Sequence, residues 1–159
     1  GLEDLAYKII NQRDFPSFGW WIEQGATTTW EQWDGGNSRN HPMFGGGIGW
    51  FYRDLAGLEA TDAGYSSFEV RPVVPEGLEC VRYSHNTTYG EIDIQWQRKA
   101  EDFTLSCVVP VGSTATIWVP FSGAEPKVKL DKNMIFKGVR DGYALYKVKS
   151  GSYTFTSKL

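Results

Sequence analysis

The spacing of apolar residues changes once along the chain, near residues 58–68, and this change most constrains the fold. Before it, apolar side chains recur every three or four residues, which is typical of helices that bury one face. After it, the segments alternate between apolar and polar residues or run apolar, and they are rich in β-branched and aromatic residues. The pattern therefore predicts a helical part followed by a β domain.

The helical part predicts a helix, a loop and a second helix. Pro16 disfavours helical geometry at the residue before it, so the first helix should end by Phe15. The second helix is predicted over residues 42–56, with Gly57 as its stop. Four glycines inside it indicate close approach of another helix or of a ligand to the backbone. The buried face of the first helix comprises Leu2, Leu5, Ala6, Ile9 and Ile10.

That apolar stripe already runs at the first residues, which suggests a chain cut from something larger. The compartment therefore cannot be determined, although a periplasmic or secreted location is slightly favoured over the cytoplasm.

The β part predicts seven to nine short strands separated by turn residues, with no helical pattern between them. Such an arrangement is typical of an antiparallel β-sandwich. We place the domain boundary between residues 64 and 65, so that residues 1–64 form the helical part and residues 65–159 the sandwich. The segments are FEVRPVV, LECVRYSH, GEIDIQWQR, DFTLSCVV, TATIWVPF, YALYKVK and SYTFTS.

Composition and residue spacing disfavour several classes of protein. The 159 residues carry a net charge of −3, with no Lys/Arg cluster for nucleic acid and no apolar run long enough for a membrane span. Cys80 and Cys107 form no CxxC pair, and we predict two buried free thiols, although the spacing leaves their pairing open. His41 and His85 have no partner at ligand spacing, so we predict no metal and no cofactor.

One stretch, GATTTWEQWDGGNSRNH at residues 25–41, places Glu31 between Trp30 and Trp33. Apolar neighbours disfavour the charged form of a carboxylate, which suits it to proton transfer. Indole faces stack on the C–H surfaces of sugars, so Trp30 and Trp33 predict a carbohydrate subsite around Glu31. Glycoside hydrolysis normally requires a second carboxylate as well. Side chains placed to bond hydroxyl groups are those of Asp34, Asn37, Asn40 and His41.

Each of these residues also has a structural explanation. Thr28 and Glu31 fit the capping box S/T-x-x-E, in which each side chain bonds the other residue's backbone N–H. Glu31 could equally be a solvated surface residue. His41 precedes Pro42 at a helix start, and His85 lies on a predicted strand, so both are explained by structural roles. The residues alone leave these alternatives open.

Residues 15–57 closely resemble the closing segment of the catalytic domain of bacterial α-L-rhamnosidases, glycoside hydrolase family 78. The family pattern "FPS-aromatic-G…GATT-x-WE-x-WD" matches residues 15–34, "S-x-NH-x-x-FG" matches residues 38–45, and "W-aromatic-YR-x-x-AG" matches residues 50–57. The segment GYSSFEVRPVVPEGLECVRYSHNTTYGEIDIQWQR is similar to the start of the family's C-terminal β-sandwich. The resemblance covers essentially the whole chain.

The resemblance implies that residues 1–64 are the last part of a six-hairpin α/α barrel, followed by a jelly-roll-like β-sandwich. It implies inverting hydrolysis of terminal α-L-rhamnosides, with Glu31 as the general base and His41 as a sugar contact. The general acid of the family lies upstream, on the barrel part that this chain lacks. We therefore expect the isolated chain to be inactive, with rhamnosides and the N-terminal part of the same protein as its partners.

Two other functions are compatible with the sequence. The β-sandwich could be a non-catalytic module that binds carbohydrate or braces the catalytic domain, or the protein could cleave a different sugar. The aromatic candidates for carbohydrate binding all lie within strands, where core packing is the stronger expectation. They are Tyr83, Trp96, Trp118 and Tyr146.

Overall fold

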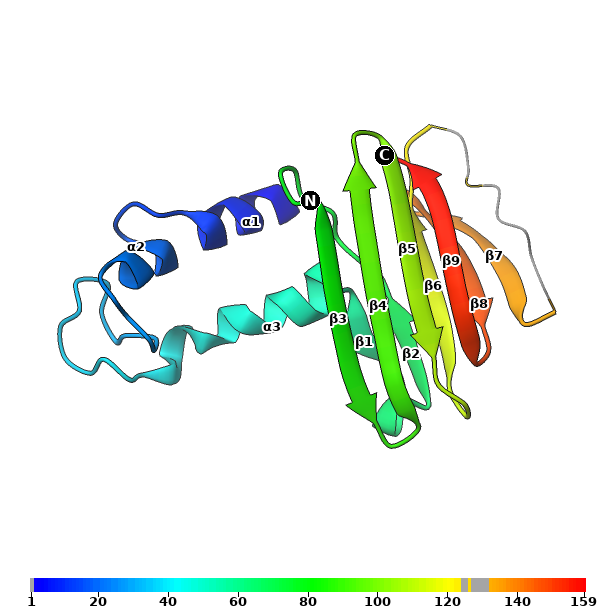
Figure 1. Cartoon of the computed structure of the whole chain (residues 1–159), viewed down its shortest axis with the longest axis horizontal. Coiled ribbons are helices and arrows are strands. Elements are labelled where there is room, and N and C mark those ends of the chain that lie inside the picture. Colours follow the sequence, from blue (N-terminus) through cyan, green and yellow to red (C-terminus); the bar gives the residue numbers. More distant parts are fainter. Residues whose placement is uncertain (1, 124–125, 127–131) are drawn as a thin grey trace. The chain divides into compact units, whose positions relative to one another are not determined.

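A computed structural model describes residues 2–123, 126 and 132–159 of the chain. The chain divides into two compact units (Figure 1): a helical unit, Gly1–Phe51 with Val74–Glu76, and a β unit, Tyr52–Val73 with Gly77–Leu159. The sequence predicts a domain boundary between residues 64 and 65. A division into compact units does not show where a folding domain ends, so this boundary stays a prediction. None of the helices in the described ranges is both long and apolar enough to cross a membrane.

Short helices make up the regular structure of the helical unit. Ser17 caps the start of the helix α2: its hydroxyl accepts the backbone N–H of Trp20 at 2.9 Å and so satisfies a free donor of the first turn. The helical segments are α1 (Glu3–Asn11), α2 (Phe18–Glu23), the 3₁₀-helix η1 (Pro42–Gly47) and α3 (Ile48–Trp50). The π-helical turn η2 (Phe51–Leu55) continues α3 along the chain into the β unit.

The first helix ends before Phe15, as predicted, but its predicted buried face is wrong for this chain. Leu2, Leu5 and Ile9 are 74%, 52% and 54% exposed, and α1 has no buried residue. An amphipathic helix needs a second surface to cover its apolar stripe. The described residues supply no such surface over these three side chains.

The second predicted helix exists over nearly the predicted range, as three consecutive segments of different hydrogen-bonding geometry. Gly45, Gly46 and Gly47 form the end of the 3₁₀ segment, and glycine has low helix propensity. The sequence did not predict α2, because six residues are too few to show a helical period.

The β unit consists of two sheets that face each other (Figure 1). The first sheet has the order β1-β2-β6-β8-β7 and the second has the order β3-β4-β5-β9. All described pairs are antiparallel except β2 with β6, which is parallel. The first sheet contains β1 (Leu58–Ala60), β2 (Ser67–Val70), β6 (Thr114–Pro120), β8 (Tyr143–Val148) and β7 (Met134–Arg140). The second contains β3 (Cys80–Thr87), β4 (Gly90–Lys99), β5 (Asp102–Val109) and β9 (Gly151–Lys158). A 3₁₀ turn, η3 (Ala63–Tyr65), lies between β1 and β2 along the chain.

The core of the β unit lies between the sheets, as the period-two pattern predicted. The rings of Tyr146 on β8 and Phe155 on β9 lie 5.1 Å apart and join the two sheets. The indole N–H of Trp96 donates to the carbonyl of Leu55 at 2.6 Å, which ties the end of η2 to the core. Fully buried residues include Phe68, Val70, Ile92, Ile94, Phe103, Leu105, Ile117, Val119 and Val148.

The sandwich fold and seven strands were predicted from the sequence, but β1 and β7 were not. The strand β1 has only three residues, which is too short to show alternation. A bulge between Phe136 and Gly138 shifts the register of β7 against β8, and this interrupts the period of two.

Gly57 ends the helical stretch, as predicted, with a φ of 78°. An added Cβ there would lie 2.3 Å from the backbone carbon of Arg71 and from the backbone nitrogen of Pro72. Glycine is therefore required twice, by the left-handed conformation and by the close approach of the chain before β3.

Gly57→Ala should destabilise the protein more than Gly142→Ala. Both glycines have a φ of 78°, but an added Cβ at Gly142 would meet nothing within 4 Å. The conformational cost, about 1–2 kcal/mol, is shared, so the difference in the free energy of unfolding by urea measures the backbone clash. Equal losses in the two variants would contradict the role given to close packing at Gly57.

Both cysteines are free, as predicted, but the predicted burial holds only for Cys107. Cys80 lies on the exposed side of β3, where side chains alternate between exposed and half-buried. Burial of Cys107, and to a lesser extent the carboxylate of Asp93, raise the pKa of its thiol to about 12.

The free energy of unfolding should fall as the pH rises from about 8.5 to about 12. In this window the unfolded Cys107 releases its proton whereas the folded thiol retains it, so ionisation favours the unfolded chain. Cys107→Ala lacks this contribution, while the tyrosines and lysines that titrate in the same range are common to both proteins. Urea unfolding at several pH values should therefore give a steeper decline for the wild type, and parallel curves would refute the prediction.

Candidate functional site

Glu31 and His41 lie on the two arms of one loop, residues 28–41. The arms run side by side through two backbone hydrogen bonds of 2.8 Å, from Glu31 N–H to the Ser38 carbonyl and from His41 N–H to the Thr29 carbonyl. The hydroxyls of Thr28 and Thr29 donate to the carbonyls of Arg39 and His41, which adds two more links. The structure therefore brings the two predicted site residues together in one hairpin-like loop.

The predicted capping box at Thr28 and Glu31 is wrong. The Thr28 hydroxyl bonds the carbonyl of Arg39, and the backbone N–H of Glu31 bonds the carbonyl of Ser38. No helix begins at this point, and the Glu31 N–H that a cap would satisfy is bonded to the opposite arm of the loop.

The carboxylate of Glu31 accepts one hydrogen bond on each oxygen. Asn37 Nδ2 lies 3.4 Å from Oε1, and the backbone N–H of Ser38 donates to Oε2 at 3.1 Å. Glu31 is half-buried, and no ion pair to it occurs among the described residues. Two neutral donors leave lone pairs on both oxygens, so the carboxylate can still accept a proton or a further hydrogen bond.

The indoles of Trp30 and Trp33 pack into an aromatic cluster. Trp30 is 4% exposed, and its ring lies 5.8 Å from that of Trp21. The ring of Trp33 lies 4.4 Å from that of Trp21 and 4.6 Å from that of Phe44. The indole N–H of Trp21 donates to the carbonyl of Trp33 at 2.9 Å. These contacts fix both ends of the Glu31 segment. Contact of either indole with a sugar stays a prediction.

Arg39 closes the tip of the loop over the buried indole. Its guanidinium carbon lies 4.6 Å from the centre of the Trp30 ring, within the range of a cation–π interaction. Its Nε donates to the carbonyl of Gly35 at 3.1 Å. Gly35 has a φ of 82°, and an added Cβ there would lie 2.8 Å from the Trp30 ring, so only glycine fits.

His41 lies at the start of a helix and caps it, which is the structural role that the sequence suggested. Its Nδ1 accepts the backbone N–H of Met43 at 3.2 Å and caps η1. Since Nδ1 is an acceptor, the neutral ring carries its proton on Nε2, which leaves one N–H for an external acceptor. Contact with a sugar stays a prediction.

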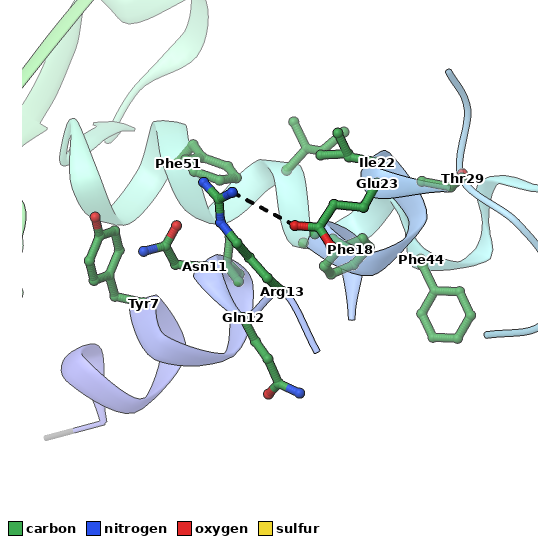
Figure 2. Close-up of a pocket in the computed structure, with 14 residues that line it drawn as sticks. Tyr7, Asn11, Gln12, Arg13, Phe18, Ile22, Glu23, Thr29, Phe44 and Phe51 are labelled. Atoms are coloured by element: carbon green, nitrogen blue, oxygen red, sulfur yellow. Dashed lines mark ion pairs between the residues drawn. The ribbon is translucent and has the colours of Figure 1, made fainter. Parts of the chain in front are cut away.

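An apolar pocket of about 490 Å³ lies beside α1, α2 and η1 (Figure 2). Arg13 and Glu23 form an ion pair of 3.7 Å at its edge, and both side chains are largely exposed. Among its other lining residues are Tyr7, Ile10, Phe18, Ile22, Phe44 and Phe51. Glu31 and His41 do not line this pocket, although the polar side chains of Asn11, Gln12 and Thr29 do.

A second pocket, of about 760 Å³, borders the arms of the loop. Its walls include Thr27, Thr28, Thr29 and Asn40, which offer hydroxyl and amide groups, beside the rings of Phe18 and Trp21. Glu31 and His41 are outside its lining as well, although Thr29 and Asn40 are close neighbours of both in the loop.

The aromatic residues proposed for carbohydrate binding in the β unit are mostly part of its core. Trp96, Trp118 and Tyr146 are at most 5% exposed, which confirms the expectation of core packing. Tyr83 is half-buried, and its hydroxyl lies 3.2 Å from His85 Nδ1. Burial raises the pKa of Tyr83, and Tyr65 and Tyr52 add to this shift. Among the described residues, no three acidic, histidine or cysteine side chains gather as metal ligands.

Two family models match consecutive parts of the chain. The bacterial alpha-L-rhamnosidase 6 hairpin glycosidase domain matches residues 1–55, and the bacterial alpha-L-rhamnosidase C-terminal domain matches residues 57–133. An alpha-L-rhamnosidase from Streptomyces avermitilis is 35% identical over 167 aligned residues, which cover 98% of this chain and 16% of that protein. One from Formosa agariphila is 33% identical, with 85% of this chain and 16% of that protein covered.

Solved structures show the same similarity. A crystal structure of Streptomyces avermitilis alpha-L-rhamnosidase complexed with L-rhamnose matches with a TM-score of 0.84 at 35% identity, over 96% of this chain and 16% of that one. Alpha-L-rhamnosidase from Dictyoglumus thermophilum matches with a TM-score of 0.83 at 34% identity, over 100% of this chain and 19% of that one. This chain therefore spans 16–19% of the length of these relatives.

Arg39→Ala should loosen the loop without unfolding the helical unit. The change removes a cation–π contact worth about 0.5–1 kcal/mol at an exposed site, together with the hydrogen bond to Gly35. Amide hydrogen exchange over residues 31–41 should become faster, whereas α2 should keep its protection. The control is Arg82→Ala, at an exposed arginine of β3; unchanged exchange in the loop of Arg39→Ala would refute the clamp.

Proposed function

This chain belongs to the bacterial α-L-rhamnosidase family, and we propose that it supplies the general base for the hydrolysis of terminal α-L-rhamnosides. The activity is that of the whole protein, because this chain spans 16% of the curated relatives that it matches. The general acid is assigned to the part of the protein outside this chain. On its own the chain should be inactive.

The state of Glu31 is the observation that carries this proposal. Its carboxylate is only half-buried, is held by two neutral donors, and has no ion pair among the described residues. A general base needs a fixed orientation, a free lone pair and access to water. The Glu31 carboxylate meets these requirements, and it stands at the position of the general base in the family pattern.

In the proposed reaction, a water molecule lies between Glu31 and the anomeric carbon of the rhamnoside. Glu31 takes one proton from this water while the oxygen of the water forms a bond to the anomeric carbon. The bond from that carbon to the leaving oxygen breaks at the same time, and the general acid protonates the leaving oxygen. An inverting pair of carboxyl groups lies about 6.5–9.5 Å apart to leave room for the water, and the product is the β anomer.

His41 is proposed to bind the sugar through Nε2. The Nδ1 of its ring accepts the Met43 N–H and thereby fixes the orientation of the ring. A neutral imidazole held in this way presents one N–H donor, which suits a rhamnose hydroxyl. Trp33, which is half-buried, is proposed to border the same subsite, whereas Trp30 is buried and is proposed to support the loop through its packing on Trp21.

Further helices of the six-hairpin domain are proposed to cover the exposed apolar surface of the helical unit. This surface comprises Leu2, Leu5 and Ile9 on α1 and the apolar pocket beside α2. The match of residues 1–55 to the six-hairpin model supports this assignment. A periplasmic or secreted location is also proposed.

A bracing role is proposed for the β-sandwich, rather than carbohydrate binding. Its tryptophans are buried in or against the sheets, so they are not available to stack on a sugar. The hydrogen bond from Trp96 to Leu55 instead ties the end of the helical stretch to the sandwich core.

The decisive substitution is Glu31→Ala in the full-length protein, assayed on an aryl α-L-rhamnoside. Loss of the base should lower kcat by about 10²- to 10⁴-fold, and the wild type should release the β anomer, as followed by NMR. Azide can occupy the space of the missing carboxylate and attack without a base, so it should restore turnover and give the β-rhamnosyl azide.

Glu59→Gln, at an exposed glutamate of β1, serves as the control and should leave kcat unchanged. Near-normal turnover of Glu31→Ala would end the assignment of the base. Release of the α anomer by the wild type would end the inverting mechanism.

A further inference from the structure

We propose that Asn37 is the positioning residue for Glu31, acting both through its side-chain amide and through its left-handed backbone. The inference rests on the proposed function of Glu31 as the general base. The family pattern described above does not include this residue, which lies at the tip of the loop between the WE-x-WD and S-x-NH segments.

Asn37 controls both donors to the carboxylate. Its own Nδ2 lies 3.4 Å from Oε1, while the next backbone N–H, that of Ser38, donates to Oε2 at 3.1 Å. One donor on each oxygen fixes the plane of the carboxylate as well as its position. A glutamate side chain otherwise rotates about three bonds, so two donors restrict the orientations from which Glu31 can accept a proton.

The backbone of Asn37 is left-handed, with a φ of 56°. Residues other than glycine rarely adopt this conformation, and asparagine is among those that tolerate it best. The direction of the following N–H group depends on this turn, so the Ser38 donor depends on the conformation of Asn37. The residue therefore makes two contributions that substitutions can separate.

The rest of the loop holds this tip in place. Glu31 and Ser38 also share the backbone bond from Glu31 N–H to the Ser38 carbonyl, which keeps the two residues side by side. Arg39, the residue after Ser38, is fixed over the ring of Trp30 and donates a hydrogen bond to the carbonyl of Gly35. The tip is thus anchored on both sides of Asn37.

No other side chain in the described part of this loop donates to Glu31. Asp34 is occupied with the turn itself, because its Oδ1 accepts the backbone N–H of Gly36 at 2.9 Å. An amide is also suited to the task. Asn37 donates to the carboxylate and cannot take up the proton that Glu31 receives from water.

The test uses the full-length protein with Asn37→Gly and Asn37→Ala. Glycine removes the amide but retains the left-handed turn, whereas alanine removes the amide and strains the turn. Misplacement of a catalytic group by about 1 Å costs on the order of 100-fold in rate. We expect kcat to fall about tenfold in Asn37→Gly and further in Asn37→Ala, with KM nearly unchanged in both.

A double substitution separates positioning from a general structural effect. If Asn37 acts through Glu31, adding Asn37→Gly to Glu31→Ala should cause no further loss of the azide-supported rate. Asn37→Asp places a second carboxylate against Glu31, and like charges at this distance disfavour the ionised base, so kcat should fall more than in Asn37→Gly. Asp141→Gly is the control, since Asp141 is also a left-handed residue but lies in the β unit.

The possible failures can be told apart. If Glu31→Ala keeps its activity, the proposed function fails whatever Asn37 does. If Glu31→Ala is inactive but Asn37→Gly keeps the wild-type kcat, only the positioning role fails. A rise in KM alone, or a full additional loss in the double variant, would show that Asn37 acts on the substrate or the fold and would overturn the inference.

Discussion

The packing of Trp21 against the two ends of the Glu31 segment is the interaction on which the candidate site depends. Residues 28–41 contain no strand and no helix before η1, so the loop cannot derive its shape from regular hydrogen bonding alone. Trp21 is 2% exposed and contacts the rings of Trp30 and Trp33, and its indole N–H donates to the Trp33 carbonyl. Aromatic pairs add about 0.5–1.5 kcal/mol each beyond the area they bury, so this cluster can hold an irregular loop rigid.

Rigidity of this kind matters because a general base works only from a narrow range of positions. The residues that hold Glu31 in place are close to it in the sequence. They run from the helix α2, which carries Trp21, to the tip of the loop at Asn37 and Ser38. The orientation of the Glu31 carboxylate is therefore set by local structure, whereas the proposed sugar site would also need residues outside this chain.

The fold was predictable where each strand or helix buries one face of a regular pattern. Seven strands were identified because their inner positions, such as Ile92, Ile94 and Trp96 of β4, alternate with exposed residues. Elements that were missed lack this periodicity, either because they are short, as are β1 and α2, or because a bulge interrupts them, as in β7. The face of α1 was predicted correctly as apolar, but a sequence cannot state whether anything covers it.

The candidate site was predictable in its residues but not in their arrangement. Glu31 and His41 could be identified from the family pattern, and the structure places them in one loop. The indoles next to Glu31 in the sequence suggested an apolar environment for its carboxylate. However, Trp30 is buried in the aromatic cluster, whereas the carboxylate of Glu31 bonds Asn37 and Ser38. Asn37 was named from the sequence only as a possible contact to sugar hydroxyls. Its contact with Glu31 was not predictable, because it depends on a positive φ and on how the arms of the loop pair. Such features follow from how the arms pair, and the pairing in turn follows from the aromatic cluster beneath them.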